Sequence, residues 1–399
     1  MAKLTDKLNV YKAELAEELK NILRFWADHT PDQLNGGFFG RLDNDGRMIG
    51  DAPKGSVLNA RILWTFSAAF NHSPDTNHLK IASRAYDYIC RYFLDHEYGG
   101  VYWSVDHKGA ALDTKKQVYA VAFTIYAFSE FYLASGNEAV KQKAIDLFYL
   151  LVEKAYDPVQ TGYFEAFTKE WKPIDDLRLS AKDANEKKTM NTHLHVLEAY
   201  TNLYRVWPDK ALNEHISVLL GNFLNHFINH QTHHLSLFFD EDWNTRSRLV
   251  SYGHDIEASW LLLEAAEVIQ DEQAIVQLKE ISVRMVNETT NGLDADGGLW
   301  YEYEPADDHL VKEKHWWVQA EAMVGFFNAW QLSGDEKFLE LSINTWRFVK
   351  DKIIDRTNGE WFWGIGPDGR VMSTEDKVGV WKCPYHNSRA CMEIIIRIN

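Results

Sequence analysis

Hydrophobic positions along this chain follow two alternating patterns, one with a helical period and one that alternates like a short strand. The strand-like pattern recurs in six short segments rich in glycine and aromatic residues, which begin at residues 35, 98, 161, 233, 296 and 358. Marker positions in these segments, at residues 36, 99, 162, 235, 297 and 359, are 62 to 73 residues apart. Such a regular period indicates an architecture of six repeated units.

Each unit also contains two helical stretches. In the second unit, residues 114–136 read "TKKQVYAVAFTIYAFSEFYLASG" and residues 137–157 read "NEAVKQKAIDLFYLLVEKAYD", with Gly136 ending the first helix. Two helices cannot bury their apolar faces alone, so consecutive units must stack. Six units that close on themselves predict an all-α fold, an (α/α)6 barrel of six helical hairpins. It would have an inner and an outer ring of helices, with short β-hairpins at one end.

The chain composition favours one large domain with a small-molecule ligand. Its nine prolines are scattered and no low-complexity linker interrupts it, so we expect a single catalytic domain over residues 1–399. The chain has 42 basic and 58 acidic residues, and the resulting net charge of −16 argues against nucleic-acid and anionic-membrane partners. Nothing in the sequence marks an interface, which predicts a monomer or a weak homo-oligomer.

The first residues, "MAKLTDKLNVYKAELAEELK", form an amphipathic helix pattern without the apolar core of a signal peptide. No apolar run approaches the length of a membrane span, so we expect a cytoplasmic protein. The three cysteines, Cys90, Cys383 and Cys391, include no C-x-x-C pair and suggest neither a disulfide framework nor a zinc site.

Aromatic residues make up 14% of the chain. Taken alone, this content favours aromatic packing between helices over the alternative, a cleft whose ring faces hold sugars.

Polar side chains gather near the first turns of the helices that follow the six aromatic segments. They are Arg61, Tyr119, Asn191, His195, His254, Glu257, Trp317, Glu321 and His386. If these helices form the inner ring, their N-terminal ends all face one central pocket. Residues three or four apart share a helix face, which lets His254 and Glu257 point the same way, as can Trp317 and Glu321.

Each of these residues also has a purely structural interpretation. Asp255 is a candidate helix cap, Glu257 a partner of first-turn amides, and Arg61 a member of a buried ion pair. His193 and His195 lie on different faces of their helix, so one of them is expected to be structural. Three histidines and an arginine at equivalent positions of different units nevertheless favour a functional cluster.

Four strings, "TMNTHLHVLEAYTNLY", "SYGHDIEASWLL", "HWWVQAEAMVGF" and "WKCPYHNSRACMEI", occur in this order at characteristic separations. In them the chain resembles the N-acylglucosamine 2-epimerase superfamily, and within it most closely the cellobiose 2-epimerases. The resemblance runs from about the first helix to the C-terminus. It implies the (α/α)6 barrel reached above from the repeat, and inversion of C2 at the reducing end of a sugar without a cofactor.

The resemblance also implies roles for individual residues. His254 and His386 would be the two acid/base groups, with His195 and Arg61 holding the oxygens at C1 and C2. Glu257 and Glu321 would orient histidines. The remaining pocket residues would be the stacking rings of Trp317 and Trp381 and the wall groups Tyr119 and Asn191.

These residue types suit the implied chemistry. A C2 proton can be removed only after the sugar ring opens to a C1 carbonyl, and the anion left behind is an enediolate. Histidine titrates near neutrality and suits the proton steps, while a permanently charged arginine suits the enediolate oxygens. The resemblance implies a small-molecule sugar substrate, with cellobiose converted to glucosyl-mannose and lactose to epilactose. No compact metal-ligand motif such as H-E-x-x-H is present, so no metal is expected.

Several alternatives stay open at this point. An inverting glycoside hydrolase would use two carboxylates, from the candidates Asp183, Glu257 and Glu321, but gives no role to three histidines. A non-catalytic sugar-binding protein would need only the aromatic cleft. Within the superfamily, a mannose 2-epimerase or an aldose–ketose isomerase competes with a disaccharide enzyme. The loops near residues 170–190, 230–250 and 365–380 should decide whether a second sugar fits, and Trp171, Trp243 and Trp381 are their aromatic candidates.

Overall fold

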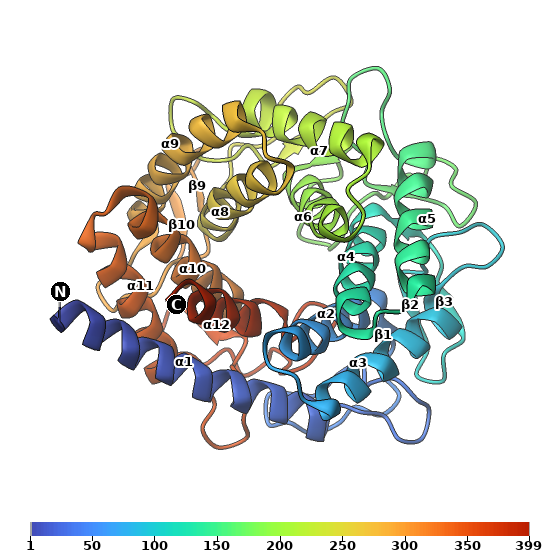
Figure 1. Cartoon of the computed structure of the whole chain (residues 1–399), viewed down its shortest axis with the longest axis horizontal. Helices are drawn as coiled ribbons and strands as arrows, with labels where there is room; N and C mark the ends of the chain where they lie inside the picture. The colour runs from blue at the N-terminus through green and yellow to red at the C-terminus, as the bar shows by residue number, and fades with distance from the viewer. Residues whose placement is uncertain (1, 399) are drawn as a thin grey trace.

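In a computed structural model, which describes residues 2–398, twelve α-helices form two concentric rings (Figure 1). The inner ring contains α2 (Ser56–His72), α4 (Val118–Ser135), α6 (Met190–Val206), α8 (Tyr252–Ile269), α10 (Trp316–Ser333) and α12 (Tyr385–Arg397). The outer ring contains α1 (Ala2–His29), α3 (Thr76–Tyr88), α5 (Glu138–Lys154), α7 (Lys210–Asn222), α9 (Glu272–Thr289) and α11 (Glu336–Phe348). The expected (α/α)6 barrel is confirmed.

Inner and outer helices differ in sequence because they differ in burial. Nearly every residue in the first three turns of α4, α8 and α10 is buried, which accounts for their largely apolar composition outside the polar positions described below. The outer helices α3, α9 and α11 instead bury one face, as an amphipathic pattern predicts. Three outer helices end in a π-helical turn, at Ile89–Phe93, Phe223–Phe227 and Val349–Ile353. A short 3₁₀ turn, Thr290–Gly292, follows α9.

Short strands gather at the end of the ring where the inner helices begin. They are β1 (Lys54–Gly55), β2 (Ser104–Val105), β3 (Ala111–Asp113), β4 (Lys116–Gln117), β5 (Ala166–Phe167), β6 (Lys188–Thr189), β7 (Phe238–Phe239), β8 (Val250–Ser251), β9 (Glu302–Glu304), β10 (His309–Val311), β11 (Lys314–His315) and β12 (Gly364–Ile365). Hairpins within a unit do occur, as β2 with β3 and β9 with β10.

Most of the strand pairing, however, joins consecutive units. The strand that precedes each of the first five inner helices pairs antiparallel with a strand of the next unit, as in β1 with β2, β4 with β5 and β6 with β7. The last unit meets the first through a bridge between Leu42 and Val378. The strands therefore tie neighbouring helical hairpins together and close the circle.

The N-terminal helix completes the outer ring. Figure 1 shows α1 running beside α12, so the two ends of the chain form the sixth helical hairpin. Indole nitrogens join α1 to the aromatic segment that precedes α12: Trp26 donates to Glu360 at 2.7 Å, and Trp361 donates to Glu18 at 2.7 Å. All four of these side chains are buried.

One inner helix corrects an expectation from the sequence. The stretch Val118–Ser135, which is α4, is long and apolar enough to cross a membrane by length and composition. In the barrel, however, 72% of it is buried, and it packs between α2 and α6. Its apolar character is explained by its place in the inner ring.

Candidate active site

A cavity of about 500 Å³ lies where the inner helices begin. Nine of the ten predicted site residues line it: Arg61, Tyr119, Asn191, His195, His254, Glu257, Trp317, Trp381 and His386. The tenth, Glu321, is fully buried and contacts His386 from below. The barrel therefore brings together side chains that are up to 325 residues apart in the sequence.

The repeat explains this convergence. Counted from the first residue of each inner helix, and from Pro384 for the last, the sixth residues are Arg61, Phe123, His195, Glu257, Glu321 and Arg389. The third residues include His254 and His386, which therefore occupy equivalent positions of two units. Positions three apart lie on one helix face, so His254 and His386 line the same cavity as Arg61, His195 and Glu257 of the sixth-residue layer.

Four histidines line the cavity, and three of them, the predicted His195, His254 and His386, are each held through Nδ1. Glu198 Oε2 accepts from His195 Nδ1 at 2.9 Å, and Glu321 Oε1 accepts from His386 Nδ1 at 2.7 Å. For His254 the partner is a hydroxyl, with Ser251 Oγ 2.8 Å from Nδ1. Fixing Nδ1 sets the orientation of each ring and leaves Nε2 for a substrate.

The expected role of Glu257 differs from its observed contacts. Its Oε1 lies 3.9 Å from Nδ1 of His386, which is too far for a hydrogen bond. Instead, Oε1 of Glu257 accepts from Arg389 Nη2 at 2.7 Å, and Oε2 is buried without a partner among the described residues. Glu257 therefore faces the cavity as part of a charged cluster, and it orients neither His254 nor His386.

That cluster contains residues that the sequence analysis missed. Arg389, from α12, also donates to Glu321 at 2.6 Å, and it contacts Glu198 and the hydroxyl of Tyr385. Two signals could have found the missing carboxylate and arginine. Glu198 follows His195 by three residues, the spacing used above for His254 and Glu257, and Arg389 completes the layer of sixth residues.

Burial sets the protonation states at the floor of the cavity. It lowers the pKa of His254 to about 3, with a contribution from nearby His195, and it also lowers the pKa of His195. Burial, together with the charges of Arg61 and Arg389, holds the pKa of His386 well below its usual value. All three rings are therefore neutral near pH 7 and able to accept a proton.

The pKa values of the carboxyl groups are shifted in opposite directions. Burial and the negative charge of Glu321 raise the pKa of Glu257 to about 8. Burial opposes ionisation of Glu198 as well, but the charge of Arg389 and the hydrogen bond from His195 bring its pKa down to about 2. Near pH 7 the cluster thus holds an ionised Glu198 beside a Glu257–Glu321 pair that retains a proton.

Arg61 is placed as a free cation at the cavity wall. It donates to the hydroxyl of Tyr119 at 2.7 Å, and its guanidinium lies 4.2 Å from the ring centre of Phe123. Among the described residues it forms no ion pair with a carboxylate, so the alternative of a buried ion pair does not apply. Trp317 stands between the two third-position histidines, with ring centres 4.9 Å from His254 and 5.7 Å from His386.

Two polar residues of the inner helices turn away from the cavity. His193 accepts from the backbone N–H of Tyr163 at 2.9 Å through Nε2, and its Nδ1 lies 2.7 Å from the carbonyl of Thr189. Asp255 accepts from the backbone of Leu235 at 2.8 Å and also binds His234. His193 is therefore the structural member of its pair, and Asp255 anchors a neighbouring turn instead of capping its own helix.

The loops at the cavity mouth contribute unequally. Residues 177–184 and Glu186 line the cavity, as do Tyr301, Glu302 and Trp363. Trp381 also lines it, whereas Trp171 and Trp243 are packed into loops, with indole nitrogens donating to the carbonyls of Tyr98 and Gln160. Of the three aromatic candidates for an extended subsite, only Trp381 therefore reaches the cavity.

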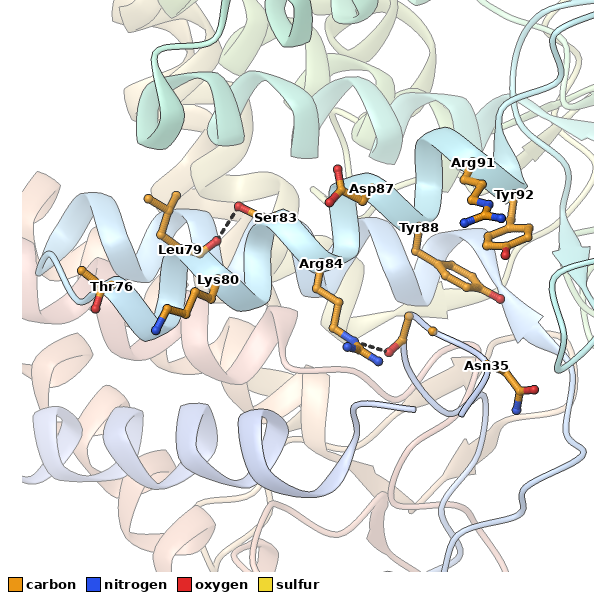
Figure 2. A pocket seen from close by; sticks show the side chains of 12 residues that line it. Asn35, Thr76, Leu79, Lys80, Ser83, Arg84, Asp87, Tyr88, Arg91 and Tyr92 are labelled. Carbon is orange, nitrogen blue, oxygen red and sulfur yellow. Dashed lines mark hydrogen bonds between the residues drawn. The ribbon is translucent and has the colours of Figure 1, made fainter. Parts of the chain in front are cut away.

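A larger hollow, of about 840 Å³, lies on the outer wall (Figure 2). It is lined by one face of α3 and by the turn at residues 35–37, and it presents Lys80, Arg84 and Arg91. Figure 2 shows Arg84 reaching from α3 to that turn, where it donates to the carbonyl of Gly37 at 2.8 Å. No histidine is among its lining residues, so it lacks the proton-transfer groups of the inner cavity.

Glu257, Glu321 and His386 have ligand atoms within 4.8 Å of one another, a spacing that could hold a metal ion. The guanidinium of Arg389 already binds both carboxylates, at 2.7 and 2.6 Å. A cation at the same place would be repelled by it. The arrangement is that of a charge-compensated cluster.

Comparison with known proteins places this geometry in context. A family model described as N-acylglucosamine 2-epimerase matches residues 37–390. Cellobiose 2-epimerase of Bacteroides fragilis is 46% identical over 387 residues, covering 97% of this chain and 99% of that protein. D-mannose isomerase of Marinomonas mediterranea is 23% identical, and the alignment covers 90% of this chain and 91% of that protein. The solved cellobiose 2-epimerase from Bacillus thermoamylovorans superposes with a TM-score of 0.93 at 40% identity, covering 98% of this chain and 100% of that one.

Proposed function

The chain belongs to the N-acylglucosamine 2-epimerase family, and we propose that it inverts C2 at the reducing end of β-1,4-linked disaccharides. Its substrates would include cellobiose, giving glucosyl-mannose, and lactose, giving epilactose. The observation that carries this proposal is the meeting of His195, His254, His386 and Arg61 around one cavity, with Nδ1 of each ring held from behind.

The proposed reaction begins with the open-chain form of the sugar, whose C1 carbonyl makes the C2 proton acidic. One histidine removes that proton, and the electrons pass to the carbonyl oxygen to give an enediolate. Arg61, which carries a charge and no carboxylate partner, would stabilise the enediolate oxygens, assisted by His195 at O1. The other histidine returns a proton to the opposite face of C2.

His254 and His386 are the proposed exchanging pair. They come from equivalent positions of α8 and α12 and both line the cavity, which suits transfer at two faces of one carbon. Burial keeps both rings neutral near pH 7, as a base must be before it accepts a proton. The reaction is reversible, so the two residues exchange roles with its direction.

A disaccharide preference rests on relatives and on the cavity mouth. The cellobiose 2-epimerases above match nearly the full chain, and Trp381, Trp363 and Tyr301 offer ring surfaces toward the mouth. The likeness to a D-mannose isomerase favours a second candidate, action on free mannose. That reaction would use the same enediolate, with the proton returned to C1 in an isomerase or to C2 in an epimerase.

The Glu257–Glu321 pair does not fit an inverting hydrolase. Glu257 and Glu321 have oxygens within 4.8 Å of each other, whereas an inverting pair is separated by about 6.5–9.5 Å to admit a water molecule. Both are also bound by Arg389. This pair is therefore unsuited to the inverting mechanism.

Product analysis with mannose, glucose, cellobiose and lactose tests the proposal. We expect cellobiose and lactose to yield glucosyl-mannose and epilactose by NMR, faster than either monosaccharide reacts. Turnover of free mannose alone would replace the disaccharide assignment with the second candidate. Release of glucose from cellobiose, or binding without turnover, would refute epimerisation.

A further inference from the structure

Beneath the cavity, one side chain joins the two carboxylates that hold His195 and His386. Arg389 contacts Glu198, the partner of His195, and donates at 2.6 Å to Glu321, the partner of His386. Its third carboxylate is Glu257, at 2.7 Å. The side chain is only 2% exposed and does not line the cavity, so it acts on a substrate through other residues.

The geometry of a guanidinium suits this position. Its planar fork has several N–H donors in fixed directions, so one residue can bind carboxylates from α6, α8 and α10 at once. An ammonium group presents the same charge from a single point. The requirement at this position is therefore for a shape as well as for a charge.

Arg389 also influences the position of Arg61. The ring of Tyr385 lies between the two guanidinium groups, 4.3 Å from that of Arg389 and 5.0 Å from that of Arg61. The hydroxyl of Tyr385 donates to Glu198 and accepts from Arg389. Displacing Arg389 would thus disturb the arginine at the cavity wall as well as the two histidines.

We propose that Arg389 is the positioning residue of this site, holding Glu198 and Glu321 so that His195 and His386 face one substrate in a fixed relation. The inference rests on the proposed epimerase function. It adds a link between two histidines that the chain presents on separate helices. It also explains why three buried carboxylates from three helices stand together, since each alone would be costly to bury.

The charges around Arg389 make the proposal testable by pH. The titratable groups that face it are His195 and Glu198 of α6, Glu257 and Glu321 of α8 and α10, Tyr126 of α4, and Tyr385, His386 and Glu393 of α12. The positive charge of Arg389 contributes to the lowered pKa of His195 and of His386. Removing that charge should raise both, so the acid limb of kcat/KM moves to higher pH.

Two substitutions separate charge from shape. Arg389→Lys keeps the charge but loses the fork, and we expect kcat to fall by roughly 100-fold while KM and the acid limb change little. Arg389→Met loses both, and we expect the same fall in kcat together with a shift of the acid limb to higher pH. Arg397→Met, on the same helix but bonded to Glu393 and Asn328 away from the cavity, is the matched control.

Each variant is assayed with cellobiose beside the unmodified enzyme, after circular dichroism has verified its fold. If Arg389→Met does not fold, Arg389→Lys decides alone. The positioning role would be overturned by a folded Arg389→Lys enzyme whose kcat equals that of the unmodified enzyme. It would also be overturned by a folded Arg389→Met enzyme whose acid limb of kcat/KM stays at the same pH. An unmodified enzyme that does not epimerise cellobiose would instead overturn the proposed function, so the two failures are distinct.

Discussion

His254 and His386 occupy the same position in two inner helices but are held by different groups. A serine hydroxyl contacts Nδ1 of His254, whereas the carboxylate of Glu321 accepts from Nδ1 of His386. A carboxylate partner stabilises an imidazolium more than a hydroxyl does, because it supplies a negative charge. The two residues are therefore suited to the same reaction with different balances between acid and base.

Replacing His386 tests its assignment. Asparagine can hydrogen-bond but cannot carry a proton between pH 5 and 8, so His386→Asn should lower kcat by about 100- to 10,000-fold. His230→Asn, at an exposed histidine bonded to the carbonyl of Leu224, is the control and should retain full activity. Steady-state kinetics with cellobiose provide the measurement. A His386→Asn enzyme with unchanged kcat would remove this residue from the proposed mechanism.

The raised pKa of Glu257 predicts an alkaline limb in the pH profile. Burial and the charge of Glu321 bring this pKa to about 8, so the pair loses its shared proton as the pH rises through that value. The added negative charge beneath the cavity should then disfavour the enediolate and lower kcat/KM. A glutamine cannot titrate, so Glu257→Gln should move the alkaline limb to higher pH. An alkaline limb that stays in place in the variant would show that another group causes it.

Sequence reasoning reached the polar residues that stand out near the helix starts and missed residues whose roles depend on particular side-chain contacts. Histidines near helix starts were visible because the six-unit repeat places such starts at one end. Ser251 and Tyr385 lie only three and four residues from His254 and Arg389, but a serine before a helix and a tyrosine in an aromatic-rich chain indicate no role until these contacts are seen. The proposed catalytic roles of His195, His254, His386 and Arg61 stay predictions.

At the scale of elements, the fourth residues of three inner helices repeat one hydrogen-bonding arrangement. His193 in α6, Asp255 in α8 and Gln319 in α10 each accept the backbone N–H of the aromatic segment beside them, from Tyr163, Leu235 and Leu299. Gln319 also donates to the carbonyl of His315, as His193 does to that of Thr189. Three different side chains thus perform one structural task.

This equivalence predicts that His193→Gln preserves fold and activity. It also predicts a change in acid stability. Burial lowers the pKa of His193 from 6.5 to about 3, so its contribution to the free energy of unfolding is full above pH 6.5 and is lost as the pH falls toward 3. The glutamine variant should lose less stability over that range, as measured by urea unfolding at several pH values. Equal losses in both proteins would contradict this account.

A buried lysine and aspartate fix the glycine turn in most units. The pairs include Lys54 with Asp32 at 2.8 Å, Lys116 with Asp95 at 2.6 Å and Lys188 with Asp157 at 2.7 Å. In the fourth unit the corresponding positions are Val250 and Asn229, whose amide oxygen still accepts two turn N–H groups. The fourth unit therefore lacks both the lysine charge and the aspartate charge.

The residues of the fourth unit therefore suggest a double variant of the second unit. Lys116→Val alone would leave Asp95 buried and uncompensated, and should lower the free energy of unfolding by about 3–5 kcal/mol. Asp95→Asn with Lys116→Val copies the fourth unit and should recover most of that loss. Urea unfolding of the three proteins measures both effects. A double variant as unstable as the single one would show that the pair does more than compensate charge.

Strand pairing was the part of the element pattern that the sequence described least well. The aromatic segments predicted hairpins within units, and turns such as the bridge between Leu94 and Val101 confirm them locally. The pairing between β4 and β5, which joins the second unit to the third, has no local sequence signal. Two-residue strands carry too few side chains to specify a partner, so the stacking of the helices determines the pairing.

At the scale of the molecule, closure of the ring creates the site. The N-terminal helix packs against α12, and Glu360 ties the two by accepting from Trp26, from Lys382 at 2.6 Å and from Asn387 at 2.7 Å. Lys382 and Asn387 flank His386 in sequence. Helix α12 can therefore present its histidine only when the first and last parts of the chain have met.

The central claim is that this closed ring moves a proton on and off one sugar carbon. The most direct test follows cellobiose in D2O by NMR with the unmodified enzyme. We predict that glucosyl-mannose forms with deuterium at C2 of its reducing-end residue, because the returning proton exchanges with solvent through a histidine. Glucosyl-mannose without deuterium at C2, or cellobiose that remains unchanged, would contradict the account.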